Sequence, residues 1–286
     1  MILKVFTALS ALLALLSAVC GTIWLLPVYF VSYFLGFLVL AVAVLLISCA
    51  TVDVEKPQEE DSPFFRWMAR YYVELVVQLM RIRIHTQGLE KTPKDGRFVV
   101  VCNHINDVDP AVLLHCFPDS GLSFISKKEN KHMFVIGKVM HMLQCQLIDR
   151  ENDREALKTI LKCIQIIKED KASIGVFPEG YVSLDGRVRH FRSGVLKIAQ
   201  KAGVPIVVCT IQGTKTVVPA IKRLQPSDVQ LHLVDVISAE QVKAMTTVDL
   251  GEMIYEMMVA DMGEAFRCDE KAMHPDLQRK MMEQES

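Results

Sequence analysis

The sequence predicts an α/β fold, with a mostly parallel central sheet flanked by helices and an N-terminal hydrophobic helical hairpin in front of it. Two observations carry this prediction. Positions 5–52, a run of 48, contain no charged residue, which suits the interior of a bilayer. After position 80, short β-branched segments alternate with segments of helical period, as in strands joined by crossover helices. We therefore divide the chain into a membrane hairpin at 1–52, a linker and interfacial amphipathic helix at 53–80, and an α/β domain at 81–286.

The uncharged run is long enough for two helices, since about 20 helical residues cross a bilayer. We expect them at 5–26 and 28–50, with a break near Gly21 and Pro27. A cleaved signal peptide is the alternative, but its apolar core spans only about 7–15 residues. Length does not distinguish a spanning hairpin from a re-entrant one, so both stay open.

Composition narrows the functional class. The 286 residues are 51% hydrophobic with a mean hydropathy of +0.28, more apolar than an ordinary soluble chain. The eight cysteines are scattered without a CxxC pair, which predicts reduced thiols and a domain on the cytoplasmic side of the membrane. A net charge of −1 gives no reason to expect a nucleic-acid partner.

The elements follow from local signals. Asp61 or Ser62 before Pro63 predicts a helix start, and the helix at 63–80 has a broad apolar face that suits either a membrane surface or the domain core. We expect strands at 81–86, 97–103, 122–126, 173–177, 205–211 and 229–236. We expect helices at 109–116, 133–142, 153–169 and 192–202.

The first candidate site is the turn from Asn103 to Pro110, directly after an apolar strand. Histidine titrates near neutral pH, and a nearby carboxylate can orient its ring, so His104 with Asp109 predicts a general base. The spacing alone is not specific. Both residues could instead cap a helix that starts near Pro110, or bind a metal together with Asp107.

Two further segments lie at strand ends. Phe177, Pro178, Glu179 and Gly180 form a predicted tight turn, which is either an ordinary β-turn or a carboxylate placed beside His104 in a parallel sheet. Arg150, before the helix of 153–169, could bind phosphate at a helix N-terminus. Lys127 and Lys128 could reinforce that pocket, or belong to a solvated basic face.

Together these residues resemble the glycerolipid acyltransferases typified by lysophosphatidic acid acyltransferase. Four blocks occur in the family's order. They are Asn103-His104 through Asp109, Leu147-Ile148-Asp149-Arg150, Phe177 through Gly180, and the proline-containing strand Val204-Pro205-Ile206-Val207-Val208. The resemblance covers roughly 81–215 together with the hairpin, and each block alone is far less specific than the four in order.

The resemblance implies roles for these residues. His104 would be the base and Asp109 its partner, and Arg150 would contact the acceptor's phosphate. Glu179 and Gly180 would help to bind the acceptor. Apart from the resemblance, we also count Asn103, Phe177, Pro178, Lys127 and Lys128 as candidate substrate-binding residues. The strand at Pro205 would help to shape the acyl-donor region.

The sequence departs from the family in two places. Tyr181-Val182-Ser183 stands where Thr-Arg-Ser is usual, which removes a cation expected near the phosphate, and Arg187, Arg189 or Arg192 could compensate. The fourth block lacks its common second proline, having Val208-Cys209.

We therefore expect transfer of a fatty acyl group from acyl-CoA or acyl carrier protein to a lysophospholipid hydroxyl at a membrane surface, with no metal and no bound cofactor. The most plausible acceptor is 1-acylglycerol-3-phosphate, giving phosphatidic acid. Another lysophospholipid or glycerol-3-phosphate remains an alternative acceptor. A thioesterase or lipase could use the same pair, although the GxSxG motif is absent. A non-catalytic lipid-binding protein is the third possibility.

Overall fold

The computed structural model describes residues 2–56, 61–149 and 152–268. A seven-stranded sheet in the order β1-β7-β6-β2-β5-β3-β4 forms its centre. The strands are β1 (Ile82–Gln87), β2 (Val99–Cys102), β3 (Ser123–Lys127), β4 (Gln146–Ile148), β5 (Ile174–Val176), β6 (Ile206–Gln212) and β7 (Ser227–Ile237). Neighbouring strands run parallel except β6 and β7, which are antiparallel. The predicted mostly parallel sheet is confirmed.

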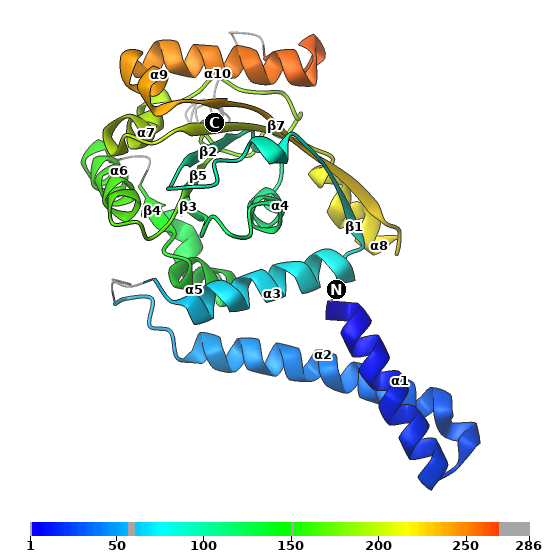
Figure 1. Cartoon of the computed structure of the whole chain (residues 1–286). Coiled ribbons are helices and arrows are strands. Elements are labelled where there is room, and N and C mark those ends of the chain that lie inside the picture. The colour runs from blue at the N-terminus through cyan, green and yellow to red at the C-terminus, as the bar shows by residue number, and fades with distance from the viewer. Residues whose placement is uncertain (1, 57–60, 150–151, 269–286) are drawn as a thin grey trace, which may run out of the picture.

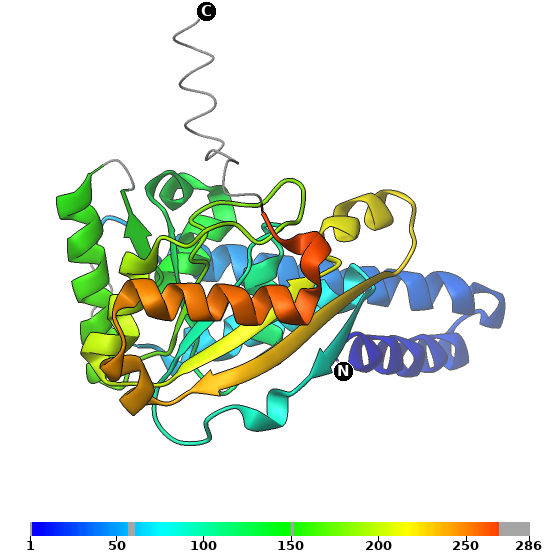
Figure 2. The same cartoon turned by 90° about the horizontal axis from the view of Figure 1, so that it is seen from above.

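Helices cover both faces of the sheet, because alternate side chains of its strands are buried on opposite sides. Val99 and Val101 of β2 pack in a cluster with residues of α6 (Asp153–Lys168), α7 (Lys197–Ala202), α9 (Ala239–Ala244) and α10 (Thr247–Met262). Val100 and Cys102 pack in a second cluster with residues of α3 (Pro63–Leu79), α4 (Asp109–Cys116) and α8 (Val217–Lys222). Figure 1 shows α10 on one side of the sheet and α4 and α3 on the other, and Figure 2 shows α10 lying across β6 and β7.

The hydrophobic hairpin consists of α1 (Ile2–Cys20) and α2 (Leu26–Ala50). Both are long and apolar enough to cross a membrane, and most of their surface is exposed. The break lies earlier than predicted, at 21–25, because Pro27 sits in the first turn of α2 instead of before it. Proline suits that position, where its missing N–H costs no hydrogen bond. Figure 1 shows the hairpin extending away from the α/β domain beyond α3.

Helix α3 joins the hairpin to the domain. Its predicted packing on the core is confirmed, whereas its place at a membrane surface stays a prediction. Ser62 caps it by accepting the N–H of Phe65 at 3.5 Å. Met68 and Val77 are buried, whereas Phe64 and Trp67 are 54% and 61% exposed. The helix therefore packs on the core and also presents an aromatic stripe outward, which is typical of helices at a membrane interface.

The end of α2 is fixed to the domain by α5 (Phe134–Met142). The ammonium of Lys138 donates to the carbonyl of Cys49 at 2.9 Å and to that of Val52 at 3.0 Å. These carbonyls lie at the helix C-terminus, where a cation is favourable. The hydroxyl of Tyr72 on α3 adds a 2.7 Å bond to the carbonyl of Ala41. The hairpin is thus docked on the domain by specific polar contacts.

Most predicted elements match within two residues, and the differences are local. The helix expected at 192–202 is a short 3₁₀ turn, η4 (Ser193–Leu196), followed by α7. Helices α8, α9 and α10 were not predicted, and β4 was expected only as the strand preceding Arg150. The remaining 3₁₀ turns are η1 (Ile23–Leu25), η2 (Leu89–Lys91), η3 (Lys128–His132), η5 (Thr214–Thr216) and η6 (Glu264–Phe266).

Candidate active site

Three turns meet at one edge of the sheet, because β2 lies between β5 and β6 and runs parallel to both. The turn after β2 carries His104, the turn after β5 carries Glu179, and the turn after β6 carries Thr214. Carboxyl ends of parallel strands are where sites collect in α/β folds. The fold therefore brings these three residues to one edge, although His104 and Thr214 are 110 positions apart in the sequence.

His104 is oriented by two contacts. Its Nδ1 lies 2.9 Å from Asp109 Oδ2, and its ring stacks on Phe177 with centroids 4.1 Å apart and planes at 20°. A carboxylate can only accept a hydrogen bond, so the donor is the ring nitrogen, and we assign the imidazole proton to Nδ1. Nε2 is then the nitrogen with a free lone pair, and the side chain is 15% exposed. A nitrogen placed in this way can accept a proton from a molecule bound at this edge of the sheet, as a general base does.

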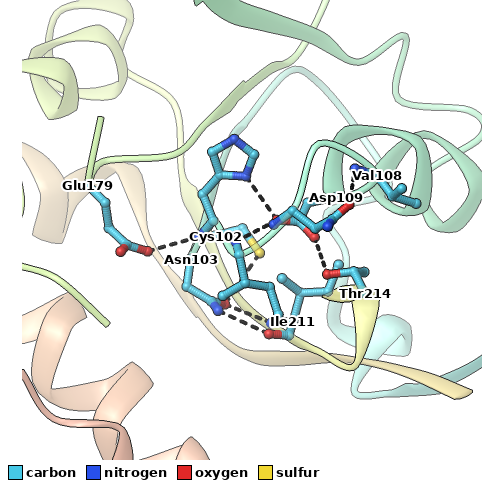
Figure 3. A network of polar contacts seen from close by, with 10 residues as sticks. Cys102, Asn103, Val108, Asp109, Glu179, Ile211 and Thr214 are labelled. Carbon is cyan, nitrogen blue, oxygen red and sulfur yellow. Dashed lines mark hydrogen bonds and ion pairs between the residues drawn. The ribbon is translucent and has the colours of Figure 1, made fainter. Parts of the chain in front are cut away.

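Asp109 is completely buried and fully used as an acceptor. Its Oδ2 also accepts the N–H groups of Ile105 at 2.7 Å and Asn106 at 2.9 Å, and its Oδ1 accepts the hydroxyl of Thr214 at 2.6 Å. Figure 3 shows Asp109 at the centre of these contacts. The two N–H groups precede α4, so the carboxylate orders the histidine turn, and the alternative of a simple helix cap does not describe it.

Glu179 and its turn hold the main chain of His104. Glu179 Oε1 accepts the His104 N–H at 2.8 Å, and Oε2 accepts the Arg189 N–H at 3.1 Å. The N–H of Ser183 donates to the His104 carbonyl at 2.7 Å. Gly180 makes this turn possible, since its φ of +80° lies in the left-handed region. The prediction that Glu179 lies beside His104 is confirmed.

The pKa of the Glu179 carboxyl is unusually high because this side chain is almost completely buried. Burial raises its pKa to about 8, against the opposing effects of the His104 and Arg189 N–H groups and of the Arg189 charge. The pKa of this carboxyl therefore lies near physiological pH.

Asn103 ties the histidine turn to the neighbouring strand. Its amide nitrogen donates to the Ile211 carbonyl at 3.0 Å, and its amide oxygen accepts the Ile211 N–H at 2.7 Å. The side chain is completely buried. Because both ends of the amide are occupied by β6, this geometry favours a role in positioning His104.

Comparison with known proteins shows the family to which this chain belongs. The acyltransferase family model matches residues 83–212. A probable 1-acyl-sn-glycerol-3-phosphate acyltransferase of Mycoplasma pneumoniae is 33% identical over 201 residues, covering 68% of this chain and 74% of that protein. This chain belongs to the acyltransferase family. The predicted family and enzyme class are thereby confirmed.

Two other relatives extend the comparison. A chloroplastic 1-acyl-sn-glycerol-3-phosphate acyltransferase of Brassica napus is 37% identical over 134 residues, which are 46% of this chain and 38% of that protein. The crystal structure of the 1-acyl-sn-glycerophosphate acyltransferase PlsC from Thermotoga maritima matches with a TM-score of 0.61 at 20% identity, over 94% of this chain and all of that one. The fold of the acyltransferase is thus shared with a solved structure over most of its length.

The predicted cations of this acyltransferase lie farther along the same edge. Lys127 ends β3 and is opposite Ile148 of β4, and Lys128 Nζ pairs with Asp149 at 2.6 Å. One strand, β5, separates β3 from β2. Arg150 lies outside the described residues. The phosphate-binding role predicted for these three residues therefore stays a prediction.

Two features of the acyltransferase site were missed by the sequence reasoning. Thr214 bonds Asp109 across 105 positions, and its only sequence signal is its place just after a strand at the same edge. The second feature is the clamp on His104, which is the hydrogen bond from the Ser183 N–H to the His104 carbonyl. Because it joins main-chain atoms, no residue type in the sequence indicates it. Within the described residues, no group of three His, Cys, Asp or Glu side chains could hold a metal ion, and the set of His104, Asp107 and Asp109 is therefore not such a group.

Proposed function

We propose that the chain transfers a fatty acyl group from an acyl thioester, acyl-CoA or acyl carrier protein, to the free hydroxyl of 1-acylglycerol-3-phosphate, giving phosphatidic acid. The observation that carries the proposal is the pair of His104 Nδ1 and Asp109 Oδ2 at 2.9 Å, placed at the edge where the acyltransferase family model matches. The relatives' names supply the acceptor.

The reaction follows from the basic Nε2 of His104. This nitrogen takes the proton of the acceptor hydroxyl as its oxygen attacks the thioester carbonyl carbon, and the C–O bond forms. The tetrahedral intermediate then expels the thiolate, the C–S bond breaks, and the imidazolium returns its proton to the sulfur. Asp109 stabilises the imidazolium between the two proton transfers. His104 and Asp109 are the catalytic residues of this scheme, and Glu179, Gly180, Pro178 and Phe177 shape the acceptor side.

The membrane helices support a lipid acceptor. The exposed apolar surface of α1 and α2 and the aromatic stripe of α3 suit a bilayer, which is where both greasy substrates reside. We place the hairpin in the membrane and the catalytic domain on its cytoplasmic side, where the reduced cysteines are expected to persist. All eight cysteines are free thiols in the structure.

The test is acyl transfer by purified full-length protein in mixed micelles. Labelled acyl-CoA and acyl carrier protein thioester are each supplied with 1-acylglycerol-3-phosphate, and both diacyl product and free fatty acid are measured. We expect phosphatidic acid from the wild type and a loss of about 10²–10⁴-fold in kcat for His104→Ala, as for other general bases. Free fatty acid as the main product would favour the hydrolase alternative. Undiminished transfer by His104→Ala would refute the mechanism.

A further inference from the structure

The turn after β5 lacks the cation expected beside the acceptor's phosphate, since Tyr181 and Val182 follow Gly180. Three arginines come later in the same loop, at positions 187, 189 and 192. Their surroundings in the structure differ, and the difference identifies one of them.

Arg189 is occupied within the protein. Its guanidinium donates to Asp185 Oδ2 at 2.7 Å and to Cys268 Sγ at 2.9 Å, and only 15% of its side chain is exposed. Arg187 is exposed and lies on the tight turn that Gly186 makes with φ of +83°. Its N–H donates to Asp185 Oδ1, and its side chain makes no hydrogen bond or ion pair with the part of the chain that the structure describes.

Arg192 lies directly on the turn that holds His104. Its N–H donates to the Pro178 carbonyl at 2.8 Å. A methyl group built on Gly180 would be 3.2 Å from Arg192 Cδ and 3.3 Å from Nε, so the side chain rests against the bare backbone of Gly180. Arg192 is exposed, and within the described residues no carboxylate forms an ion pair with it, in contrast to Arg189.

We infer that Arg192 forms a phosphate-monoester site over Gly180 and replaces the cation that the loop lacks. This inference rests on the proposed function, because the phosphate is that of its acceptor. A guanidinium offers two parallel N–H groups to phosphate oxygens. Glu179, which directly precedes Gly180 in the turn, holds the His104 main chain, so the site fixes the acceptor by its phosphate beside the base. Gly180 is required for the turn and for the close approach of Arg192.

The experiment compares acceptors with and without phosphate. Full-length wild type, Arg192→Gln, Arg192→Lys and the matched loop control Arg187→Gln are assayed at saturating acyl-CoA with 1-acylglycerol-3-phosphate and with monoacylglycerol. We expect Arg192→Gln to raise KM for the phosphate acceptor at least about tenfold with a smaller change in kcat, and to leave monoacylglycerol kinetics within about twofold. Arg192→Lys should recover part of the loss, and Arg187→Gln should match the wild type.

A second readout does not depend on monoacylglycerol turnover. Inorganic phosphate should inhibit the wild type competitively with the acceptor, and about tenfold more phosphate should be needed for Arg192→Gln. An unchanged inhibition constant, or an unchanged preference for the phosphate acceptor in a folded Arg192→Gln, would overturn the inference alone. A wild type that makes no phosphatidic acid would overturn the proposed function as well, so the two failures are distinguishable.

Discussion

Replacing Thr214 by valine tests whether the hydroxyl behind Asp109 serves catalysis or only the fold. Valine has nearly the same shape, so the substitution removes the 2.6 Å bond to Oδ1 and leaves that oxygen unpaired at a site where both residues are completely buried. A hydrogen bond to a charged group contributes about 1.5–3 kcal/mol. We expect the free energy of unfolding at neutral pH to fall by about that amount.

Part of the same loss should reach the transition state, because Asp109 then holds His104 less firmly. If about half of it does, or about 0.75–1.5 kcal/mol, kcat/KM falls roughly four- to twelvefold, since about 1.4 kcal/mol corresponds to a factor of ten. Thr214→Ser should restore both the free energy of unfolding and kcat/KM.

The measurements are denaturant unfolding and kcat/KM between pH 5.5 and 9 on the same preparations. Thr216→Val is the matched control, because that hydroxyl is exposed and bonds the Gly213 carbonyl of the same turn. A Thr214→Val variant that is less stable yet keeps the wild-type kcat/KM throughout this pH range would refute the positioning role.

Two further changes probe the surroundings of the site. Burial holds the pKa of Glu179 at about 8 against an ordinary 4.5, so the folded state retains a proton that the unfolded state has lost, and unfolding free energy should fall by up to about 1.4 kcal/mol per pH unit between roughly pH 5 and 8. Glu179→Gln should abolish that slope in denaturant unfolding across this range, and equal slopes in both proteins would contradict it. Lys138→Met removes the donor to the Cys49 and Val52 carbonyls, so we expect a loss of about 1–2 kcal/mol and faster proteolysis between α2 and α3. The surface variant Lys158→Met should change neither quantity, and a Lys138→Met variant as resistant as the wild type would show that these bonds do not hold the hairpin.

The sheet and the histidine turn could be predicted because their signals are local. Apolar β-branched runs mark β2, β5 and β6, and a parallel arrangement brings the residues after them to one edge. That reasoning was enough to place Glu179 beside His104. It could not find the bond between Thr214 and Asp109, which depends on how closely the β6 turn approaches α4 across 105 positions.

The missed helices have different causes. In α10, the buried residues Leu250, Ile254 and Met258 recur every four positions. Thr246 caps the helix by accepting the Asp249 N–H. The sequence therefore contains a helical pattern with a start signal at this place. Helices α8 and α9 have six residues each, too few for a periodic pattern to be distinct. Strand β4 has three residues at the sheet edge and is paired by tertiary contacts more than by its own sequence.

The clamp on His104 has a consequence for how this loop can change over evolutionary time. Ser183 reaches the histidine carbonyl with its peptide N–H, and a peptide N–H is present whatever side chains stand at positions 181 and 182. Those two positions can therefore drift, as the Tyr-Val pair illustrates, without displacing the base. Under the proposed function, recognition of the acceptor and placement of the base would be separately adjustable parts of one short loop, so that a new head-group preference could arise there while the chemistry is inherited intact.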